Sequence, residues 1–359
     1  MVDNDISKKK ILHLINDFSS PFYANLFDSF HNYRIQHFIF STYTRKRYKK
    51  LDRSIAISHE IEHLYFPHRV IKLLLFFKIV YVVRIKKIDV IHINNGNIDG
   101  LFALLIQTLL KVPFIITLRN TDINTESRTR KHLLKLVLKK SKVIILKSPA
   151  FKSRLDETTQ SKIQIIPNGI DDFWLNNIQK QPRNTSHKEP FKIITVADFY
   201  CNKNIDKVVE AVGKLLDEGL EIRLVIVGRK NGDCKDLFSK IIQQNQSFVE
   251  YTGELSKKDL IEEYRKSNIF CLISRYETFG LVYLEALSQG LPIIYTKNQG
   301  VDGLVDDRYS IAVNIDEDNL TEVIKSCLNS SFELPEKSFF NRFSWHSVAK
   351  ELEKIYLDI

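Results

Sequence analysis

The sequence predicts an α/β protein with two domains, each built around a parallel sheet. Three observations support this prediction. The chain has 359 residues, enough for two domains with full cores. Short apolar segments alternate with helical segments along its length, as in parallel sheets joined by crossover helices. The turn Pro167-Asn168-Gly169-Ile170-Asp171 interrupts this alternation near the middle, and a polar segment at 179–190 follows as a linker or flexible loop.

In the first half we expect strands at the apolar runs and helices between them. Helices are expected near 23–30 and at 100–110, and strands at 11–15, 89–93, 113–118, 142–146 and 162–166. His92, at the end of one of these strands, fits either a hydrogen-bonded core histidine or a catalytic one.

Basic charge is concentrated in the first half. Residues 1–165 hold 29 Lys and Arg against 13 Asp and Glu, whereas residues 166–359 hold 24 against 30. Basic runs at 45–50 and in the amphipathic helix expected at 128–142 account for much of this charge. The apolar stretch 70–83 is too short to span a bilayer and fits either a buried helix or one lying at a membrane surface. An anionic membrane surface is therefore an expected partner. No nucleic acid is expected, because the basic runs lack the aromatic residues of a stacking platform.

The second half starts a new series of strands and helices. Strands are expected at 191–196, 224–227, 249–251, 269–273 and 292–295, and helices at 206–218, 236–244 and 257–266. A further helix should begin around Phe279-Gly280 and stop at Gly290-Leu291-Pro292. The strands at 269–273 and 292–295 and the helix between them form a βαβ unit, whose strand-to-helix turn is where such sheets bind phosphorylated ligands.

Two carboxylates mark this turn. Glu277 lies in the turn and Glu285 about one helical turn inside the helix, roughly 6–9 Å further along the axis. The amides of Phe279, Gly280 and Leu281 would face a charge between them, and Gly280 would allow close backbone approach. The arrangement suits a sugar–diphosphate–ribose ligand. The alternative is a pair of glutamates favoured near a helix start by its dipole.

The segment resembles the nucleotide-sugar-binding core of retaining GT-B glycosyltransferases of family four (glycosyl transferases group 1). The matching residues are Ser274, Glu277, Phe279-Gly280, Leu284-Glu285-Ala286 and Gly290-Leu291-Pro292. The resemblance is strong over 165–359 and holds in outline over 1–164. It implies two Rossmann-like domains whose parallel sheets face a central cleft. These are an acceptor domain at 1–168 and a nucleotide-sugar domain at 169–340, followed by a C-terminal helix at 341–359 that crosses back to the first domain.

The resemblance also implies roles for single residues. Glu277 would contact the transferred sugar and Glu285 the ribose hydroxyls. Lys203 and the helix start formed by Thr278, Phe279, Gly280 and Leu281 would hold the diphosphate. The resemblance implies that no metal is needed, and no cofactor is expected, because the nucleotide-diphosphate sugar is itself the donor substrate.

The match fails at several positions. Asp198 stands where the family has an arginine that binds the diphosphate, so a neighbouring cation such as Arg119, Arg229 or Arg275 should compensate. We expect Arg119 to supply this charge, with Asp122 at the position of an acidic residue in relatives. The alternative is that Arg119 simply pairs with Asp122. The family's paired glycines after the first strand are replaced by the segment 20–23.

The four cysteines are widely spaced, which predicts neither a disulfide framework nor a metal site, and the N-terminus lacks the shape of a secretory signal. We therefore expect a cytoplasmic enzyme, in part at the inner face of the membrane. It would transfer a sugar with retention and without a metal to a glycan or glycolipid acceptor, in bacterial surface polysaccharide synthesis. The alternatives are a GT-B sugar-nucleotide epimerase and a non-catalytic relative that binds membrane or nucleic acid.

Overall fold

The computed structural model describes residues 8–15, 21–32, 34–41, 72–179, 190–328 and 330–359. The predicted basic run at 45–50 and most of the expected linker lie outside these residues. The chain divides into two compact units. Unit 1 comprises residues 1–147, 152–169 and 342–359, and unit 2 comprises residues 148–151 and 170–341.

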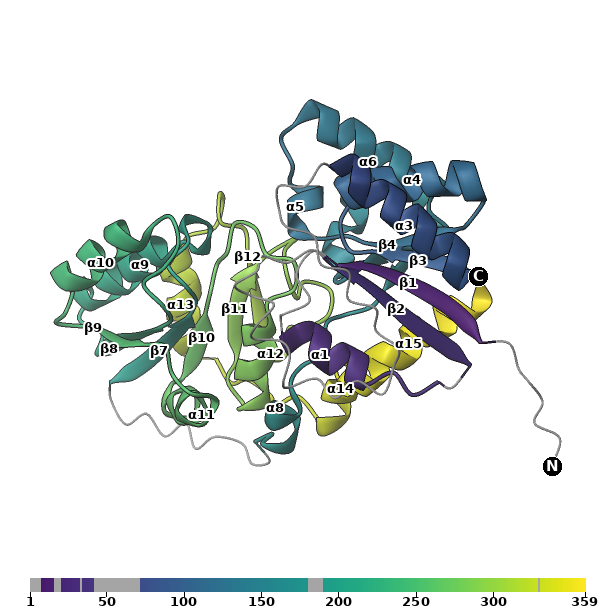
Figure 1. Cartoon of the computed structure of the whole chain (residues 1–359). Helices are drawn as coiled ribbons and strands as arrows, with labels where there is room; N and C mark the ends of the chain where they lie inside the picture. The colour runs from purple at the N-terminus through teal and green to yellow at the C-terminus, as the bar shows by residue number, and fades with distance from the viewer. Residues whose placement is uncertain (1–7, 16–20, 33, 42–71, 180–189, 329) are drawn as a thin grey trace, which may run out of the picture. The chain divides into compact units, whose positions relative to one another are not determined.

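Unit 1 is a six-stranded parallel sheet with helices on both faces (Figure 1). Its strand order is β2-β1-β3-β4-β5-β6, and the strands are β1 (Lys9–Ile15), β2 (Ile35–Ser41), β3 (Val90–Ile93), β4 (Phe114–Thr117), β5 (Ile144–Leu146) and β6 (Ile163–Ile165). All predicted strands of this half are present. Strand β2 was missed, because His37 and Gln36 break its apolar pattern, although His37 is buried.

The helices of unit 1 are α1 (Pro21–Asp28), α3 (Lys72–Lys86), α4 (Ile98–Leu110), α5 (Asn120–Ile123), α6 (Arg128–Lys140), α7 (Glu157–Gln160) and α15 (Trp345–Asp358). Helix α3 covers most of the stretch at 70–83 and is buried on one face only. Phe76 and Val82 on one face are buried, whereas Phe77 and Tyr81 on the other are 58% and 63% exposed. No helix among the described residues is both long and apolar enough to cross a membrane.

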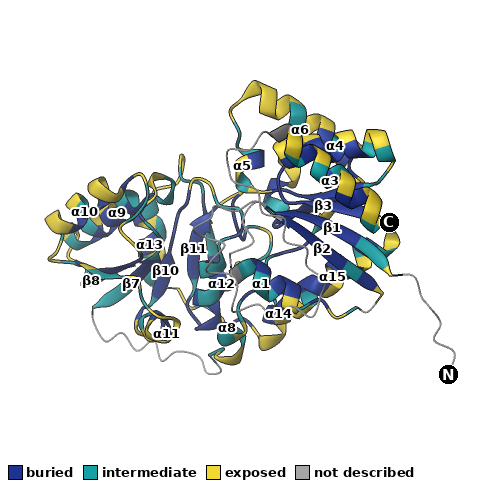
Figure 2. Ribbon diagram, viewed as in Figure 1, coloured by how far each residue is buried: buried dark blue, intermediate teal, exposed yellow. Residues whose placement is uncertain are grey.

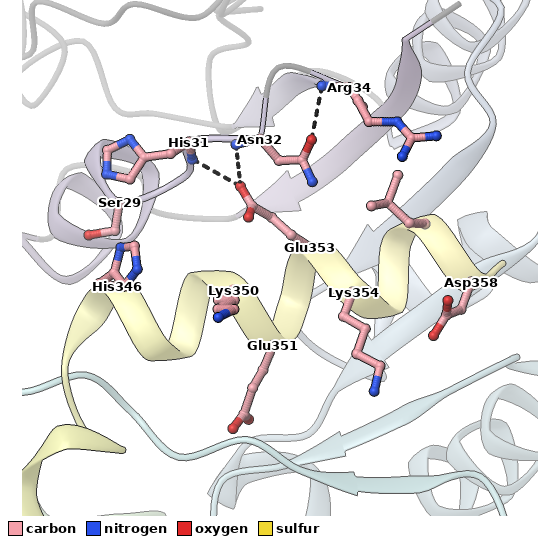
Figure 3. Close-up of a pocket in the computed structure, with 11 residues that line it drawn as sticks. Ser29, His31, Asn32, Arg34, His346, Lys350, Glu351, Glu353, Lys354 and Asp358 are labelled. Atoms are coloured by element: carbon pink, nitrogen blue, oxygen red, sulfur yellow. Dashed lines mark hydrogen bonds between the residues drawn. The ribbon is translucent and has the colours of Figure 1, made fainter. Parts of the chain in front are cut away.

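The C-terminal helix α15 is part of unit 1, where it packs against α1, β1 and β2. A Cβ on Gly169 would come within 2.2 Å of the Trp345 ring, so only glycine fits there. A carboxylate oxygen of Glu353 accepts the backbone N–H groups of His31 at 2.9 Å and Asn32 at 2.8 Å, which fastens the helix to the loop after α1. These residues border an open hollow of about 760 Å³ that contains none of the predicted site residues (Figure 3).

Unit 2 is a second six-stranded parallel sheet, in the order β12-β11-β10-β7-β8-β9. Its strands are β7 (Phe191–Val196), β8 (Ile222–Val227), β9 (Val249–Gly253), β10 (Ile269–Cys271), β11 (Ile293–Thr296) and β12 (Ser310–Val313). All five predicted strands are present and β12 was missed. The interiors of both sheets are buried, as the dark strands of Figure 2 show. The fold is therefore the predicted α/β fold with two Rossmann-like domains.

The helices of unit 2 lie on both faces of its sheet (Figure 1). They are α8 (Asp172–Asn176), α9 (Ile205–Asp217), α10 (Lys235–Gln244), α11 (Lys257–Lys266), α12 (Leu281–Ser288), α13 (Leu320–Leu328) and α14 (Lys337–Asn341), with 3₁₀ turns η1 (Pro149–Arg154) and η2 (Cys201–Lys203). The first residues of η1 belong to unit 2 and its last three to unit 1.

Candidate functional site

The predicted donor-site residues of unit 2 lie in loops that follow adjacent parallel strands. Lys203 follows β7, Arg229 follows β8 and Glu277 follows β10, and these strands are neighbours in the order β10-β7-β8. Because parallel strands end at the same edge of a sheet, the three loops share one edge, where α/β proteins bind ligands.

Glu277 and Lys203 form an ion pair. The Lys203 ammonium lies 2.7 Å from a carboxylate oxygen of Glu277, and their side chains are only 20% and 16% exposed. Asn204, in the left-handed region with φ +49°, donates its side-chain amide to the carbonyl of Ile273 at 2.7 Å. This bond ties the loop after β7 to the loop after β10 and so fixes the pair.

Two glycines leave room for the Glu277 side chain. Gly280 and Gly300 have φ of +76° and +52°, and a Cβ on either would lie 3.2 or 3.1 Å from Cγ of Glu277. The backbone N–H of Gly300 donates to the Glu277 carbonyl at 2.9 Å, and the Glu277 N–H donates to the side chain of Gln299 at 3.1 Å. Both glycines therefore combine positive φ with close approach.

Helix α12 begins at Leu281, with Gly280 as its N-cap. The Phe279 side chain is 1% exposed and belongs to the core, so only its backbone could meet a ligand. Thr278 is half-buried. The amides at this helix start carry the partial positive charge that favours an anion.

Glu285 lies one turn into α12 and is half-buried. Burial raises the pKa of its carboxyl group to about 7, although the nearby Lys257 ammonium acts in the opposite direction. Asp171, which forms an ion pair with Lys257, raises the pKa further. Glu285 is therefore balanced between its charged and neutral forms near neutral pH.

Asp198 is paired with a cation. Both of its carboxylate oxygens accept hydrogen bonds from the Arg229 guanidinium, at 2.6 and 3.2 Å, and one also accepts the Arg229 backbone N–H at 3.0 Å. Partial burial acts to raise the pKa of Asp198, but the bonds from Arg229 lower it below its usual value. Arg275, another candidate, pairs instead with Asp316 at 3.1 Å. Among the three compensating cations considered, Arg229 is the one that contacts Asp198.

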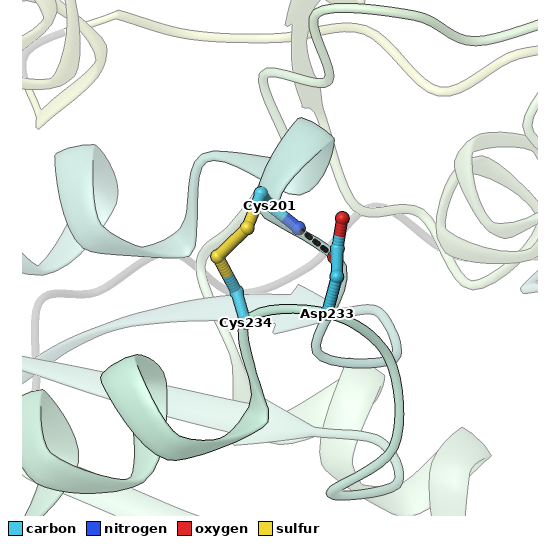
Figure 4. The surroundings of a disulfide bond; sticks show 3 residues. All are labelled: Cys201, Asp233 and Cys234. Carbon is cyan, nitrogen blue, oxygen red and sulfur yellow. Dashed lines mark hydrogen bonds between the residues drawn. A yellow bond between two sulfur atoms is a disulfide. The ribbon is translucent and has the colours of Figure 1, made fainter.

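The expectation of unpaired cysteines was wrong. Cys201 and Cys234 form a disulfide, with their Cα atoms 5.0 Å apart (Figure 4). They are 33 residues apart in sequence but lie in the loops after β7 and β8, which share one sheet edge. Asp233 accepts the backbone N–H of Cys201 at 2.8 Å and strengthens the link. These three residues also have the spacing of metal ligands, but the bonded sulfurs offer no thiolates.

In unit 1, Asp122 holds backbone rather than the Arg119 side chain. Its carboxylate accepts the N–H groups of Gly96 at 2.9 Å and Arg119 at 3.0 Å, joining the turns after β3 and β4. The Arg119 guanidinium donates to the Tyr23 hydroxyl and lies 5.9 Å from the centre of that ring. No ion pair links Arg119 with Asp122 among the described residues. The alternative of a simple Arg119–Asp122 pair is therefore wrong.

Sequence reasoning missed two buried charged residues of unit 1. Asp99, in the first turn of α4, has its pKa raised to about 6 by burial and accepts a hydrogen bond from Asn95. Lys147, directly after β5, is 9% exposed. The only signal for Lys147 was a lysine between a buried strand and the Ser148-Pro149 turn.

Two family models together match most of the chain. The model of glycosyl transferases group 1 matches residues 177–338, and that of glycosyltransferase family 4 matches residues 34–172. An uncharacterised glycosyltransferase of Methanocaldococcus jannaschii is 25% identical over 337 residues, which cover 91% of this chain and 92% of that protein.

Two further proteins are similar to this chain. Alpha-monoglucosyldiacylglycerol synthase of Streptococcus pneumoniae is 23% identical over 307 residues, covering 79% of this chain and 69% of that protein. The crystal structure of Anabaena HepE in complex with UDP shares the fold, with a TM-score of 0.72, 14% identity and coverage of 98% of this chain and 100% of that chain. The chain belongs to the family-four GT-B glycosyltransferases, the glycosyl transferases group 1.

Proposed function

We propose that this glycosyltransferase moves a sugar from a nucleotide-diphosphate donor to a glycan or lipid-linked acceptor, with retention of anomeric configuration and without a metal. The observation that carries the proposal is the Lys203–Glu277 pair beside the N-terminus of α12. It places a cation, a carboxylate and helix amides at one sheet edge, which are the groups that a sugar diphosphate requires.

Each donor-site residue of unit 2 has a role in this proposal. Lys203, Arg229 and the backbone amides of residues 278–281 stabilise the negative charge that develops on the leaving diphosphate. Glu277 touches hydroxyl groups of the transferred sugar, and Glu285 those of the ribose. UDP is the nucleotide in the similar HepE structure, which supports a nucleotide sugar as donor.

The charges on the donor edge favour metal-independent transfer. Arg229 neutralises Asp198, and Lys203 makes the same kind of contact with Glu277, so the acidic groups at this edge already have protein cations as partners. The backbone amides at the start of α12 remain to bind a diphosphate directly, beside these paired cations.

Unit 1 takes the acceptor. In it, Arg119 contacts the reacting groups as a permanent cation. Asp122 is a positioning residue, because its carboxylate holds the turns of Gly96 and Arg119 together. In this proposal Glu277 and Arg119 are the catalytic residues, and Asp122, predicted as catalytic, positions Arg119 instead.

We also place the enzyme in the cytoplasm and in part at the inner face of a bacterial membrane, where it contributes to surface polysaccharide synthesis. Eight of the twelve large apolar side chains exposed in the described chain lie on α3 and α4. They follow each other at helical spacing, as Leu74, Phe77, Tyr81 and Ile85 on α3 and Ile98, Leu101, Leu105 and Leu109 on α4.

The two helices that carry the stripes are in contact, since the buried Phe76 of α3 and Phe102 of α4 have their ring centres 5.6 Å apart. The basic helix α6 packs beside α4 and adds six lysines and arginines. Apolar stripes flanked by basic residues suit an anionic lipid surface. The similar glucosyldiacylglycerol synthase is named for a lipid product, which agrees with a lipid-linked acceptor.

Calorimetry of the full chain with UDP and a panel of nucleotide sugars tests the donor assignment. Glu285→Ala should weaken nucleotide binding by about 10- to 100-fold, the effect of one hydrogen bond to a charged group. Glu317→Ala, which changes an exposed glutamate of unit 2, is the control. Equal affinity of the Glu285 variant and the parent would refute the assignment.

The reaction itself is followed by NMR of the product anomer in the presence of a chelator. Retention without a metal predicts a product with the donor's configuration at full rate. Turnover of donor alone to an epimer, with no acceptor added, would identify the epimerase alternative instead.

A further inference from the structure

Lys147 and Arg119 occupy matching positions on neighbouring strands of unit 1. Strands β4 and β5 are parallel, with Ile116 opposite Ile144 and Thr117 opposite Ile145. Counting on by two residues places Arg119 opposite Lys147 where both strands end. Arg119 lowers the pKa of Lys147, which shows that the two cations are close enough to repel each other.

Lys147 lies in a largely buried position without a described partner. The residue is 9% exposed, and its side chain makes no hydrogen bond and no ion pair within 4 Å to any residue that the structure describes. Its ammonium group is not among the fully buried polar atoms that lack a hydrogen bond, so it can be reached from solvent. A ligand anion could therefore supply the counter-charge that the described residues do not.

The carboxylates nearby are already engaged. Asp122 accepts two backbone N–H groups, and Asp99 accepts the side-chain amide of Asn95. Glu351 on α15 attracts Lys147 but is exposed and lies beyond ion-pair distance. Arg119 likewise has only the Tyr23 hydroxyl and ring as described side-chain partners. Within the described part of the chain, two basic side chains thus lie next to each other with no acidic side chain bound to either.

We propose that Lys147 and Arg119 form an anion subsite in unit 1 that binds a phosphate or carboxylate group of the acceptor, which makes the acceptor an anionic molecule. This inference rests on the proposed function, because it assumes that unit 1 takes the acceptor. The donor diphosphate has its own cations, Lys203 and Arg229, in unit 2. A phosphate or carboxylate between two cations is bound by charge-assisted hydrogen bonds, bidentate to the guanidinium.

Binding should be coupled to proton uptake. Burial, followed by the Arg119 charge, lowers the pKa of Lys147 to about 7, whereas Glu351 raises it. Among the described residues, His92 on β3 also interacts with Lys147, and burial keeps the His92 ring neutral by lowering its pKa. An anion on Lys147 favours the ammonium form, so at pH 8 the protein should take up close to one proton per bound anion, and at pH 6 much less.

The test is calorimetry of the full chain saturated with UDP, which occupies the donor phosphate groups, and titrated with methyl phosphate. Methyl glucoside is the uncharged control ligand. Lys147→Met should fold, because an apolar side chain of similar length removes a buried charge, and a thermal melt verifies this. Lys142→Met is the matched control, since Lys142 lies exposed before the same strand at the opposite edge.

We expect methyl phosphate to bind the parent protein and Lys142→Met equally, and Lys147→Met about 10- to 100-fold more weakly. Sulfate, which does not titrate in this range, should bind with proton uptake at pH 8 that disappears in Lys147→Met. A short-chain phosphatidate below its micelle concentration is the second arm. Tighter binding of this lipid than of methyl phosphate would show that the acceptor phosphate is carried by a lipid. Equal binding of the two would show that the acceptor is a soluble molecule.

Unchanged methyl phosphate affinity in Lys147→Met would overturn the subsite. Loss of methyl phosphate binding on saturation with UDP would do the same, because the anion would then occupy the donor site. If UDP itself fails to bind, the donor assignment fails, and the methyl phosphate titration is then carried out without UDP and decides the subsite separately.

Discussion

The guanidinium of Arg229 donates two hydrogen bonds to the carboxylate of Asp198, with its Nη2 atom 2.6 Å from Oδ2 and its Nε atom 3.2 Å from Oδ1. The two residues come from the loops after β8 and β7, on the edge that carries Lys203. An acidic residue at a diphosphate site would repel the ligand, but this one holds an arginine in place. Asp198 is therefore a positioning residue for the cation that it accompanies.

The pair predicts a non-additive response to substitution. Arg229→Ala leaves Asp198 facing the donor and should weaken UDP binding by about 10- to 100-fold, while Asp198→Ala/Arg229→Ala should recover part of that loss. Arg223→Ala, on the exposed side of β8, is the control. Calorimetry measures the UDP affinity of the parent protein, Arg229→Ala, the double variant and the Arg223→Ala control. Equal losses in the single Arg229 variant and the double variant would show that Asp198 does not face the donor.

The variant Arg119→Ala distinguishes the role of unit 1 in turnover from the role of unit 2 in donor binding. Because Arg119 lies in unit 1 and Arg229 already compensates Asp198, the variant should keep UDP affinity within about threefold while turnover falls by about 10²–10³-fold, as for one lost charge-stabilising group. Kinetics with separate variation of donor and acceptor provide the measurement. A large loss of UDP affinity would contradict this prediction and would show that Arg119 binds the donor phosphates, the role expected from the sequence.

The apolar stripes of α3 and α4 predict binding to anionic vesicles. Phe77→Glu places a charge in the middle of the α3 stripe and should reduce sedimentation with anionic liposomes, and rising salt should weaken the binding of the parent protein. Leu237→Glu, at a similarly exposed leucine on α10 of unit 2, is the matched control. Equal sedimentation with neutral and anionic vesicles would remove the electrostatic part of the proposal.

The disulfide predicts sensitivity to reductant. Cys201 lies two residues before Lys203, so reduction should loosen the loop that holds Lys203 against Glu277. We expect a loss of about 2–4 kcal/mol in the free energy of unfolding of unit 2 and weaker UDP binding. Urea denaturation with and without dithiothreitol provides the measurement. Cys201→Ala/Cys234→Ala is the control, and it should resemble the reduced protein and no longer respond. An unchanged parent protein in reductant would contradict the prediction.

The elements that could be predicted from the sequence are those with a local pattern of apolar residues or a capping residue. The strand at 191–196 and the helix at 257–266 were placed to the residue. The start of the helix is defined locally by its Ser256 cap. Strands β2 and β12 were missed because their burial depends on neighbours along the sheet edge. His37 in β2 is buried because β1, Phe30 and Tyr356 of α15 pack around it.

Within the site, the carboxylates of the βαβ turn were visible from spacing, but their partners were not. Glu277 lies 74 residues from Lys203, and Asp198 lies 31 from Arg229. Such contacts follow from strand order, which the linear pattern does not contain. The disulfide was missed for the same reason, since β7 and β8 had to be placed side by side before their loops could meet.

Three histidines are buried together in unit 1 and act as a structural cluster. His13 and His37 are hydrogen-bonded to each other at 2.9 Å, and His92 bonds the Tyr356 hydroxyl at 2.7 Å and the Thr117 hydroxyl at 2.8 Å. With both ring nitrogens engaged, His92 fits a core histidine rather than a catalytic one. Tyr356 belongs to α15, so the cluster joins the C-terminal helix to the sheet.

This cluster predicts acid lability of unit 1. Burial lowers the pKa of His92 to about 3 and that of His13 well below its usual value of 6.5. The folded protein therefore keeps both rings neutral, while the unfolded chain binds protons below about pH 6.5. Their contribution to stability is complete above that pH and is lost as the pH falls toward 3, at up to about 1.4 kcal/mol per pH unit for each histidine.

His92→Gln should reduce the slope of the free energy of unfolding against pH by the equivalent of about one proton. His346→Gln, at an exposed histidine of α15, should leave that slope unchanged. Urea denaturation of the full chain between pH 7 and 5, followed by a probe on Trp345, measures the slope. Equal slopes in the parent protein and His92→Gln would show that His92 does not carry the effect.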